Sequence, residues 1–272
     1  MTFRYPRALR AGVWCSTALA LAALAACHAP AKTQQTSVAT DTWNKTFPLD
    51  PGGQVEIRNI AGIVTVDGGS DANVEVHAER VAHATTDQGA RDFLTHISIK
   101  DEETPTAVTV QTQPIAGLFV GVHFEVNYHV KVPSTASVRV RTSNGDVTVT
   151  GVGGHVSVND SNGHIIGRLI GSGFDARNAN GRIDVEIAKP SGDLIELRTV
   201  NGGIVLTLPP DMNANLSAQA VNGRADVTGL AFEPFGDGTG RGDRRLRGRI
   251  NAGGAPIELN TVRGDIRVTA HE

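Results

Sequence analysis

Histidine offers this chain its most varied chemistry, because an imidazole can bind a metal ion or transfer a proton near neutral pH. The nine histidines are scattered along the sequence, and none has a zinc-ligand spacing such as His-x₃-His. His155 and His164 lie half a repeat apart on the same side, which brings only two ligands together. We therefore predict no metal site and no cofactor.

Carboxylates are the second group of interest, since glycoside hydrolases use a pair of them across the scissile bond. Asp146 and Asp184 fall in one row of the repeat described below, with Arg182 near them, but His164 interrupts that row. The chain lacks the Gly-Gly-x-Gly-x-Asp spacing of calcium-binding β-rolls and the Gly-x-Ser-x-Gly context of a serine nucleophile. We predict no catalytic residues and no enzyme activity; a carbohydrate-active β-helix enzyme is the least favoured alternative.

The two cysteines, Cys15 and Cys27, both lie near the N-terminus, where three arginines precede an apolar run over residues 11–26. This pattern is typical of a signal peptide. The run ends in LAAC, which resembles the lipobox of bacterial lipoproteins. That resemblance implies cleavage before Cys27, acylation of Cys27 and a bacterial cell-envelope location through the lipid, in the outer membrane or periplasm of a Gram-negative cell. An ordinary secretory signal and a retained membrane anchor are the alternatives.

A basic segment, FEPFGDGTGRGDRRLRGR at 232–249, interrupts the repeat. The chain as a whole carries a formal net charge of −3, which argues against general nucleic-acid binding. A basic loop on an acidic chain favours an anionic partner, such as lipid headgroups, a surface glycan or an envelope protein. A mobile, solvated loop is the alternative. The candidate contact residues are Arg241, Arg244, Arg245, Arg247 and Arg249.

The elements that must position these residues are set by a repeat. An Asn-Gly pair followed by alternating apolar residues recurs every 18 to 21 residues, as in RTSNGDVTV, RNANGRIDV and RTVNGGIVL. This period predicts a β-solenoid whose coils stack their Asn-Gly corners. The alternative is an antiparallel β-sandwich or meander, because Asn-Gly is also a strong hairpin signal. Matching turns favour the solenoid, since a meander does not need them.

The corner column is interpreted as structural, because stacked asparagines can hydrogen-bond along the axis and asparagine tolerates positive φ. The alternative is a row of amides presented to a glycan. Its predicted members are Asn144, Gly145, Asn162, Gly163, Asn180, Gly181, Asn201, Gly202, Asn222 and Gly223.

Two inward aliphatic columns are predicted to follow the corners. The first contains Val147, Ile165, Ile183, Ile204 and Ile266, with Ala225 as a smaller member, and the second has a gap at Gly167. Further repeats are expected at Gly248 and Gly264. If the coils stack in sequence order, the polar terminus RVTAHE protects the exposed last coil.

The predicted organisation has four parts. Residues 1–26 are a lipoprotein signal peptide, and residues 27–42 are a flexible tether because they are small, polar and aperiodic. Residues 43–135 form an N-terminal β region with one short helix, which Asp87 caps and which turns Ala90, Phe93 and Leu94 to the core. Residues 136–272 form the solenoid, with the insertion at 232–249.

Three stretches, GGQVEIRNIAGIVTVDGG, VNYHVKVPSTASVRVRTSNGDVTVTGVGGHVSV and the recurring T-x-N-G-x-I-x-V, resemble the bacterial DUF4097 family of adhesin-like proteins with β-strand repeats. The resemblance covers most of residues 45–272. It implies a right-handed, single-stranded β-helix-like solenoid, and it supplies no catalytic residues.

The function expected from these features is that of a lipid-anchored envelope β-solenoid that acts as a non-catalytic binding or scaffolding surface. The alternative is an envelope-stress sensory or regulatory component that docks a membrane partner, a role to which some family members are linked. The oligomeric state stays open.

Overall fold

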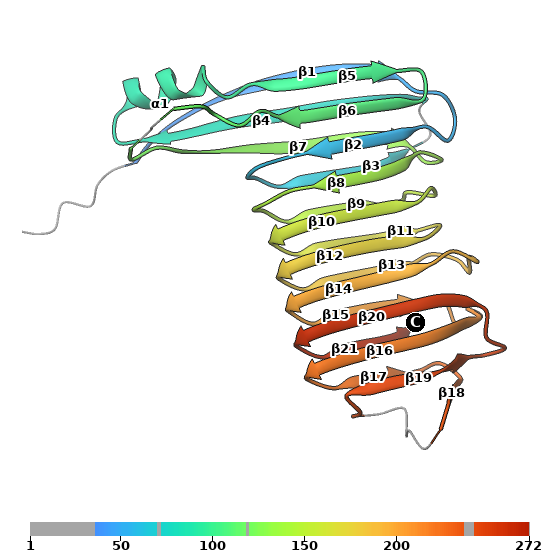
Figure 1. Ribbon diagram of the computed structural model, residues 1–272. Coiled ribbons are helices and arrows are strands. Elements are labelled where there is room, and N and C mark those ends of the chain that lie inside the picture. The colour runs from blue at the N-terminus through green and yellow to red at the C-terminus, as the bar shows by residue number, and fades with distance from the viewer. Residues whose placement is uncertain (1–35, 70–71, 118–119, 237–241, 272) are drawn as a thin grey trace, which may run out of the picture. The chain divides into compact units, whose positions relative to one another are not determined.

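The computed structural model describes residues 36–69, 72–117, 120–236 and 242–271 (Figure 1). From Thr36 onward the chain forms one compact unit. Each repeat contributes one strand to each of two sheets, and strands of successive repeats pair in parallel. The predicted β-solenoid is therefore confirmed, and the antiparallel meander does not occur among these repeats.

One sheet has ten strands and the other has eleven. In spatial order, the ten-stranded sheet contains β1 (Ser37–Pro48), β4 (Asn73–Ala84), β7 (His123–Pro133), β3 (Val64–Gly69), β9 (Val147–Thr150), β11 (Ile165–Ile170), β13 (Ile183–Ile187), β15 (Ile204–Leu208), β21 (Ile266–Ala270) and β17 (Ala225–Thr228). The eleven-stranded sheet contains β5 (Ile99–Thr104), β6 (Ala107–Thr112), β2 (Gln54–Arg58), β8 (Ser137–Arg141), β10 (Val156–Asn162), β12 (Phe174–Asn180), β14 (Ile195–Asn201), β20 (Ala255–Arg263), β16 (Ala214–Asn222), β19 (Arg245–Ile250) and β18 (Phe232–Pro234).

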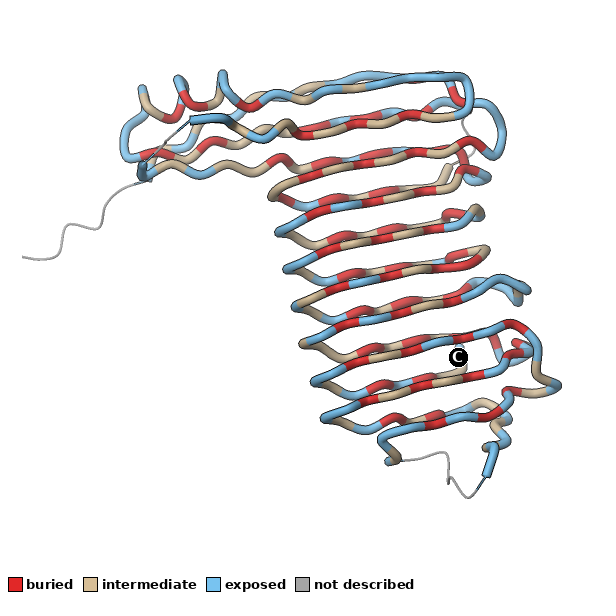
Figure 2. The backbone as a smooth tube through the Cα atoms, in the orientation of Figure 1, coloured by how far each residue is buried: buried red, intermediate tan, exposed pale blue. Residues whose placement is uncertain are grey.

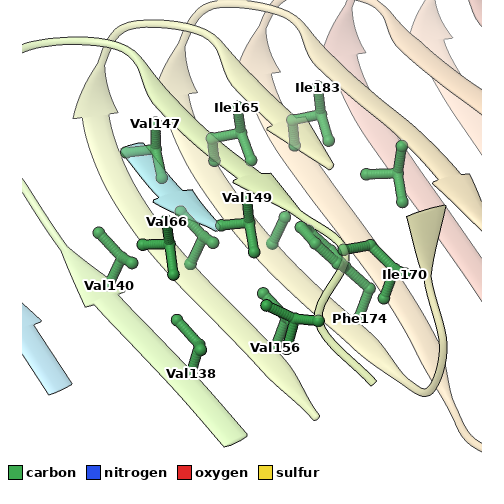
Figure 3. Close-up of a cluster of buried hydrophobic side chains, with 14 of the residues drawn as sticks. Val66, Val138, Val140, Val147, Val149, Val156, Ile165, Ile170, Phe174 and Ile183 are labelled. Atoms are coloured by element: carbon green, nitrogen blue, oxygen red, sulfur yellow. The ribbon is translucent and has the colours of Figure 1, made fainter. Parts of the chain in front are cut away.

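The core lies between the two sheets, because side chains alternate inward and outward along each strand (Figure 2). Val147, Ile165 and Ile183 are fully buried in adjacent coils of one column (Figure 3). The column continues through Ile204 and Ile266. Each aliphatic side chain thus packs on its copies above and below, and the coils share one continuous core.

The gap expected at Gly167 is filled from the other sheet. The ring of Phe174 lies where a side chain on residue 167 would stand, at 2.8 Å from an ideal Cβ position. Phe174 is fully buried, and it points between the columns together with Ile170 (Figure 3). A large residue on one sheet thus compensates for a missing one on the other, which keeps the interior filled.

The C-terminal coil does not end the stack, contrary to the sequence-order expectation. The coil β20–β21 lies between the coil β14–β15 and the coil β16–β17, and Ile266 pairs with both Ile204 and Ala225. Gly248 is not a corner either, since it belongs to β19, which pairs antiparallel with β16. The terminus RVTAHE therefore lies mostly in an internal strand, and β18 and β19 cover the last coil on the eleven-stranded sheet.

The N-terminal end is built in the same way. The coil β2–β3 comes first in the sequence, but it lies between the coil β6–β7 and the coil β8–β9. Outside β6–β7, the antiparallel strands β5, β4 and β1 close the two sheets. The region 43–135 therefore continues the stack, and no boundary separates it from residue 136 onward.

The predicted signal peptide, 1–26, and the first part of the predicted tether, 27–35, lie outside the described residues. The end of the predicted tether is a strand, because residues 37–42 belong to β1. This segment pairs antiparallel with β4 through its backbone, so it needs little aliphatic periodicity. Its Asp41 pairs with Arg80, whose guanidinium also donates to the carbonyl of Ile97 at 2.6 Å. Because this strand carries the charged residue Asp41, its sequence lacks the alternating apolar residues that would predict a strand.

Helix α1 (Asp87–Leu94) packs against β1 and β4 at the far end of the long strands (Figure 1). It buries Ala90 and Phe93 as predicted, and Leu94 is partly buried against the core. The cap is Thr86 rather than Asp87: the Thr86 hydroxyl accepts from the backbone N–H of Gly89 at 3.1 Å. No helix of the described residues is long and apolar enough to span a membrane.

Candidate functional site

The asparagine column is a hydrogen-bonded ladder. Asn162 donates to Asn144 at 3.1 Å, Asn180 to Asn162 at 2.9 Å, and Asn201 to Asn180 at 2.8 Å, each from Nδ2 to Oδ1. Each amide is already used by its neighbour, so the column offers few free groups to a ligand. The fifth predicted member, Asn222, is separated from Asn201 by the inserted coil, which places Arg263 between them.

The corner glycines are required by close approach of successive coils. A Cβ on Gly202 would stand 1.9 Å from the carbonyl oxygen of Gly181, and one on Gly181 would stand 1.8 Å from that of Gly163. Gly145 and Gly163 meet the same restriction, and Gly223 meets it against Gly264. The Asn-Gly motif is thus explained by stacking distance more than by a hairpin turn.

A buried polar column lies just inside the corner. Asn178 donates to the carbonyl of Gly163 at 2.7 Å, and Thr199 donates to that of Gly181 at 3.1 Å. Asp160 holds the equivalent place, but as a carboxylate it cannot donate, and its Oδ2 is buried with no hydrogen-bond partner in the described residues. Burial raises the pKa of the Asp160 carboxyl above its ordinary value.

The outward face of the eleven-stranded sheet carries arginines matched with carboxylates. Glu196 accepts from Arg177 at 3.1 Å and also pairs with Arg198. Toward the N-terminal end, Arg58 donates to both oxygens of Glu56 at 3.0 Å, which holds the pKa of Glu56 below its ordinary value. These charges therefore neutralise one another both within a strand, as in Arg58–Glu56, and across strands, as in Arg177–Glu196.

Asp146 and Asp184, which the repeat could have placed in one row, lie in different columns. Asp146 stands in the column of His164 and Arg182, where its carboxylate accepts the backbone N–H of His164 at 2.7 Å. Asp184 lies two residues further on, in another column, and pairs with Arg168 at 2.8 Å and with Arg182 at 3.2 Å. The two carboxylates serve separate structural contacts.

The basic segment departs from this matching. Its strand β19 turns Leu246 inward, and Arg245, Arg247 and Arg249 alternate on the exposed face. Arg249 pairs with Glu233 through two contacts of 2.8 and 2.6 Å. Arg245 donates to the amide oxygen of Gln219 at 3.2 Å. Within the described residues, no carboxylate lies at ion-pair distance from Arg244, Arg245 or Arg247.

An open hollow of about 620 Å³ adjoins this basic strand. Arg244 lines it together with Arg224 and Asp265, and Asp265 accepts the backbone N–H of Arg224 at 3.0 Å. The hollow brings Arg224 beside the predicted arginines. The sequence analysis did not single out Arg224, because it belongs to an Asn-Gly corner that was interpreted as structural.

Two of the predicted site residues lie outside the described part of the chain. Arg241 falls within residues 237–241, and Cys27 falls within residues 1–35. The two ends of the segment 232–249 pair with each other as antiparallel strands, with Phe232 opposite Ile250 and Glu233 opposite Arg249.

Histidines gather on the outward face of β4 and β7, which the sequence did not suggest. The antiparallel register sets His77 opposite His129 and His83 opposite His123. His77 contacts the side-chain oxygen of Asn44, and His129 contacts Asp67 at 2.8 Å. The partners are about forty or more residues apart in the chain, so no local spacing reveals them.

The profile of the Toastrack DUF4097 family matches residues 127–269, which is more than half of the chain. No curated protein matches the sequence. A candidate cell adhesion protein from Clostridium sporogenes shares 10% identity over 85% of this chain and all of its own, with a TM-score of 0.45.

A candidate adhesin from Bacteroides fragilis shares 8% identity over 85% of this chain and 97% of its own, with a TM-score of 0.28. The assignment rests on the family profile and not on these structures. The chain belongs to the Toastrack DUF4097 family.

Proposed function

We propose that this protein is a lipid-anchored envelope protein whose coil stack acts as a non-catalytic, adhesin-like binding or scaffolding surface. The observation that carries the proposal is the unmatched positive charge of Arg244, Arg245 and Arg247. Arginines elsewhere on the same sheet, such as Arg177 and Arg198, pair with carboxylates. An unpaired basic row on a chain of net charge −3 favours contact with an anionic partner.

The geometry of the row suits a rigid, extended contact. Arg245 and Arg247 project from alternate positions of one strand, so their spacing is fixed by the pleat. The strand is paired along its whole length by β16 and at residues 248–250 by β18, and the carbonyl of Arg247 accepts from the backbone N–H of Phe235. Binding would therefore cost little backbone ordering. A surface glycan with acidic groups and an acidic envelope protein both fit this chemistry.

The non-catalytic part of the proposal is supported by how the carboxylates are used. Glu56, Asp184 and Glu196 each hold two arginines. A glycosidase needs two carboxyl groups that face each other across the scissile bond. These carboxylates instead form ion pairs with arginines on the outward faces of the sheets.

The binding experiment is cross-linking in intact cells of the producing bacterium, followed by purification through a C-terminal tag. We expect Arg245→Glu combined with Arg247→Glu to lose the partner that the wild-type chain retains. Arg177→Glu is the matched control, because it reverses one exposed arginine that is already paired. Equal recovery by all three chains would contradict the proposed surface.

The identity of the recovered material separates the two readings. Envelope glycan supports the adhesin-like role, whereas one reproducible membrane protein supports a sensory or regulatory role. Anchoring is tested separately by labelling cells with an alkyne fatty acid. We expect label on the wild-type chain and none on Cys27→Ser, with release of that variant from the membrane fraction. Label that persists on the variant would overturn the anchor.

A further inference from the structure

The end of β4 and the start of β7 bring two imidazoles into contact, at the same end of the long strands as helix α1. The rings of His83 and His123 stack with centroids 4.2 Å apart and planes inclined by 5°. The two residues are direct cross-strand partners, and both side chains leave the outward face of the sheet. Among the described residues, neither histidine belongs to the buried core and neither has an ion pair that would account for the stacking.

A carboxylate completes the group. Glu125 lies two positions after His123 on the same strand, so the pleat turns both side chains to one face. One ligand atom from each of His83, His123 and Glu125 lies within 4.8 Å of the others. The neighbours across the strands are apolar: Val38 stands opposite His83, and Val81 stands opposite Glu125.

We propose that His83, His123 and Glu125 form a binding site for a divalent transition-metal ion, with Zn²⁺ as the ion that fits best. Two imidazoles and one carboxylate are a known zinc ligand set, with the fourth position left to water. Calcium and magnesium require oxygen ligands, and Cu(I) prefers sulfur. Zn–N bonds are about 2.0–2.1 Å, so binding requires the stacked rings to tilt toward a common point.

The second histidine pair provides the contrast. His77 and His129 are also direct partners on the same face, but His77 contacts Asn44 and His129 contacts Asp67. One ring nitrogen of each therefore already has a partner, Nδ1 of His77 and Nε2 of His129. They therefore serve as a matched control with the same residue types, the same strands and the same register.

A metal bound at this site would tie two chain segments together. His83 lies three residues before the Thr86 cap of α1, and His123 is the first residue of β7. The ion would therefore hold the ends of β4 and β7 where the long strands extend past the coils. Metal binding to the folded chain would raise its apparent stability.

The experiment titrates Zn²⁺ into the full chain against a chromophoric chelator. We expect one site per chain, and His83→Ala with His123→Ala should raise its Kd by at least about 100-fold, more than the loss of an outer hydrogen-bond partner. Glu125→Gln should weaken binding less, and His77→Ala with His129→Ala should leave it unchanged. The absence of a 1:1 site, or equal weakening in both double variants, would overturn the proposal.

A second measurement needs no substitution. Diethyl pyrocarbonate modifies accessible imidazoles, and mass spectrometry locates the modified residues. Zn²⁺ should slow modification of His83 and His123 at least about tenfold, because the ion occupies the reacting nitrogen, and His77 and His129 should react at unchanged rates. Co²⁺ should give visible bands without thiolate charge transfer, which distinguishes this site from Cys15 and Cys27. Protection spread over all four histidines would contradict the site.

Discussion

The two ends of the coil stack are closed by the same topological device but finished with different surfaces. At each end, the coil that is terminal in the sequence is inserted one position inside the stack: β2–β3 at one end and β20–β21 at the other. The N-terminal end then adds long antiparallel strands, a helix and the histidine face. In the described residues, the C-terminal end adds the short strands β18 and β19, of which β19 carries Arg245, Arg247 and Arg249.

This comparison also explains where the asparagine ladder stops. The ladder spans the coils from Asn144 to Asn201, which are consecutive in both sequence and space. Ala61 pairs with Asn144 at one end, and Arg263 follows Asn201 at the other. The inserted coils therefore interrupt the repeat at both ends, and the functional candidates lie beyond these interruptions.

The largest expected effect tests the inserted C-terminal coil. Ile266 is fully buried between Ile204 and Ala225, so Ile266→Asp places a charge in the core. We expect a loss of more than about 4 kcal/mol in the free energy of unfolding. Urea denaturation followed by circular dichroism measures it, with Arg267→Asp on the same strand as the exposed control. If coils stacked in sequence order, Ile266→Asp would only fray the terminus.

The contact of the last coil with the inserted coil gives the second test. A Cβ on Gly223 would stand 1.9 Å from the carbonyl oxygen of Gly264. Gly223→Ala should therefore destabilise the fold by roughly 3 kcal/mol, because backbone must move to relieve the clash. Gly192→Ala is the control, since an added Cβ meets nothing within 4 Å there. Similar thermal midpoints for the two variants would show that the coils do not approach this closely.

The third test concerns Asp160, a buried carboxyl group in the middle coils. Because the native pKa of Asp160 is raised, the folded state binds its proton more tightly than the unfolded state does. The contribution of Asp160 to stability is then fully present below the ordinary value of 3.8 and is lost as the pH rises through the raised native pKa.

Asp160→Asn should remove this pH dependence and gain about 1 kcal/mol at neutral pH, because an amide can donate to the corner carbonyl of Gly145. The measurement is the free energy of unfolding at acidic and neutral pH. Asn178→Asp is the reverse substitution one coil away and should lose stability as the pH rises. A gain for Asp160→Asn that is equal at both pH values would rule out the carboxylate as its cause.

The smallest expected effect locates the limits of the ladder. Asn180→Ala removes three exposed side-chain hydrogen bonds, to Asn162, to the carbonyl of Ser161 and from Asn201, and should cost about 0.5–1 kcal/mol. Asn222→Ala should cost less, since Arg263 separates Asn222 from the ladder. Chemical denaturation of the two variants side by side measures the difference. Equal costs would place Asn222 in the same ladder as Asn180.

Much of the site chemistry followed from tertiary pairing. The arginines of the 232–249 segment were visible in the sequence, but only the structure distinguishes Arg249, which is paired with Glu233, from Arg245 and Arg247. The cluster of His83, His123 and Glu125 had one local signal, the His-x-Glu alternation on a strand. Its third member comes from an antiparallel register that no local pattern encodes.

The sequence by itself determined the coil: the two strands, the Asn-Gly corner and the inward columns from Val147 to Ile204. Only the tertiary structure decided the order of the coils and the caps that close them. The physical reason is that every coil presents nearly the same surface to its neighbours, namely a row of backbone hydrogen-bonding groups and an aliphatic column. Such surfaces can pair with any other coil, so the connecting segments and the capping strands β4, β5 and β19 select the arrangement.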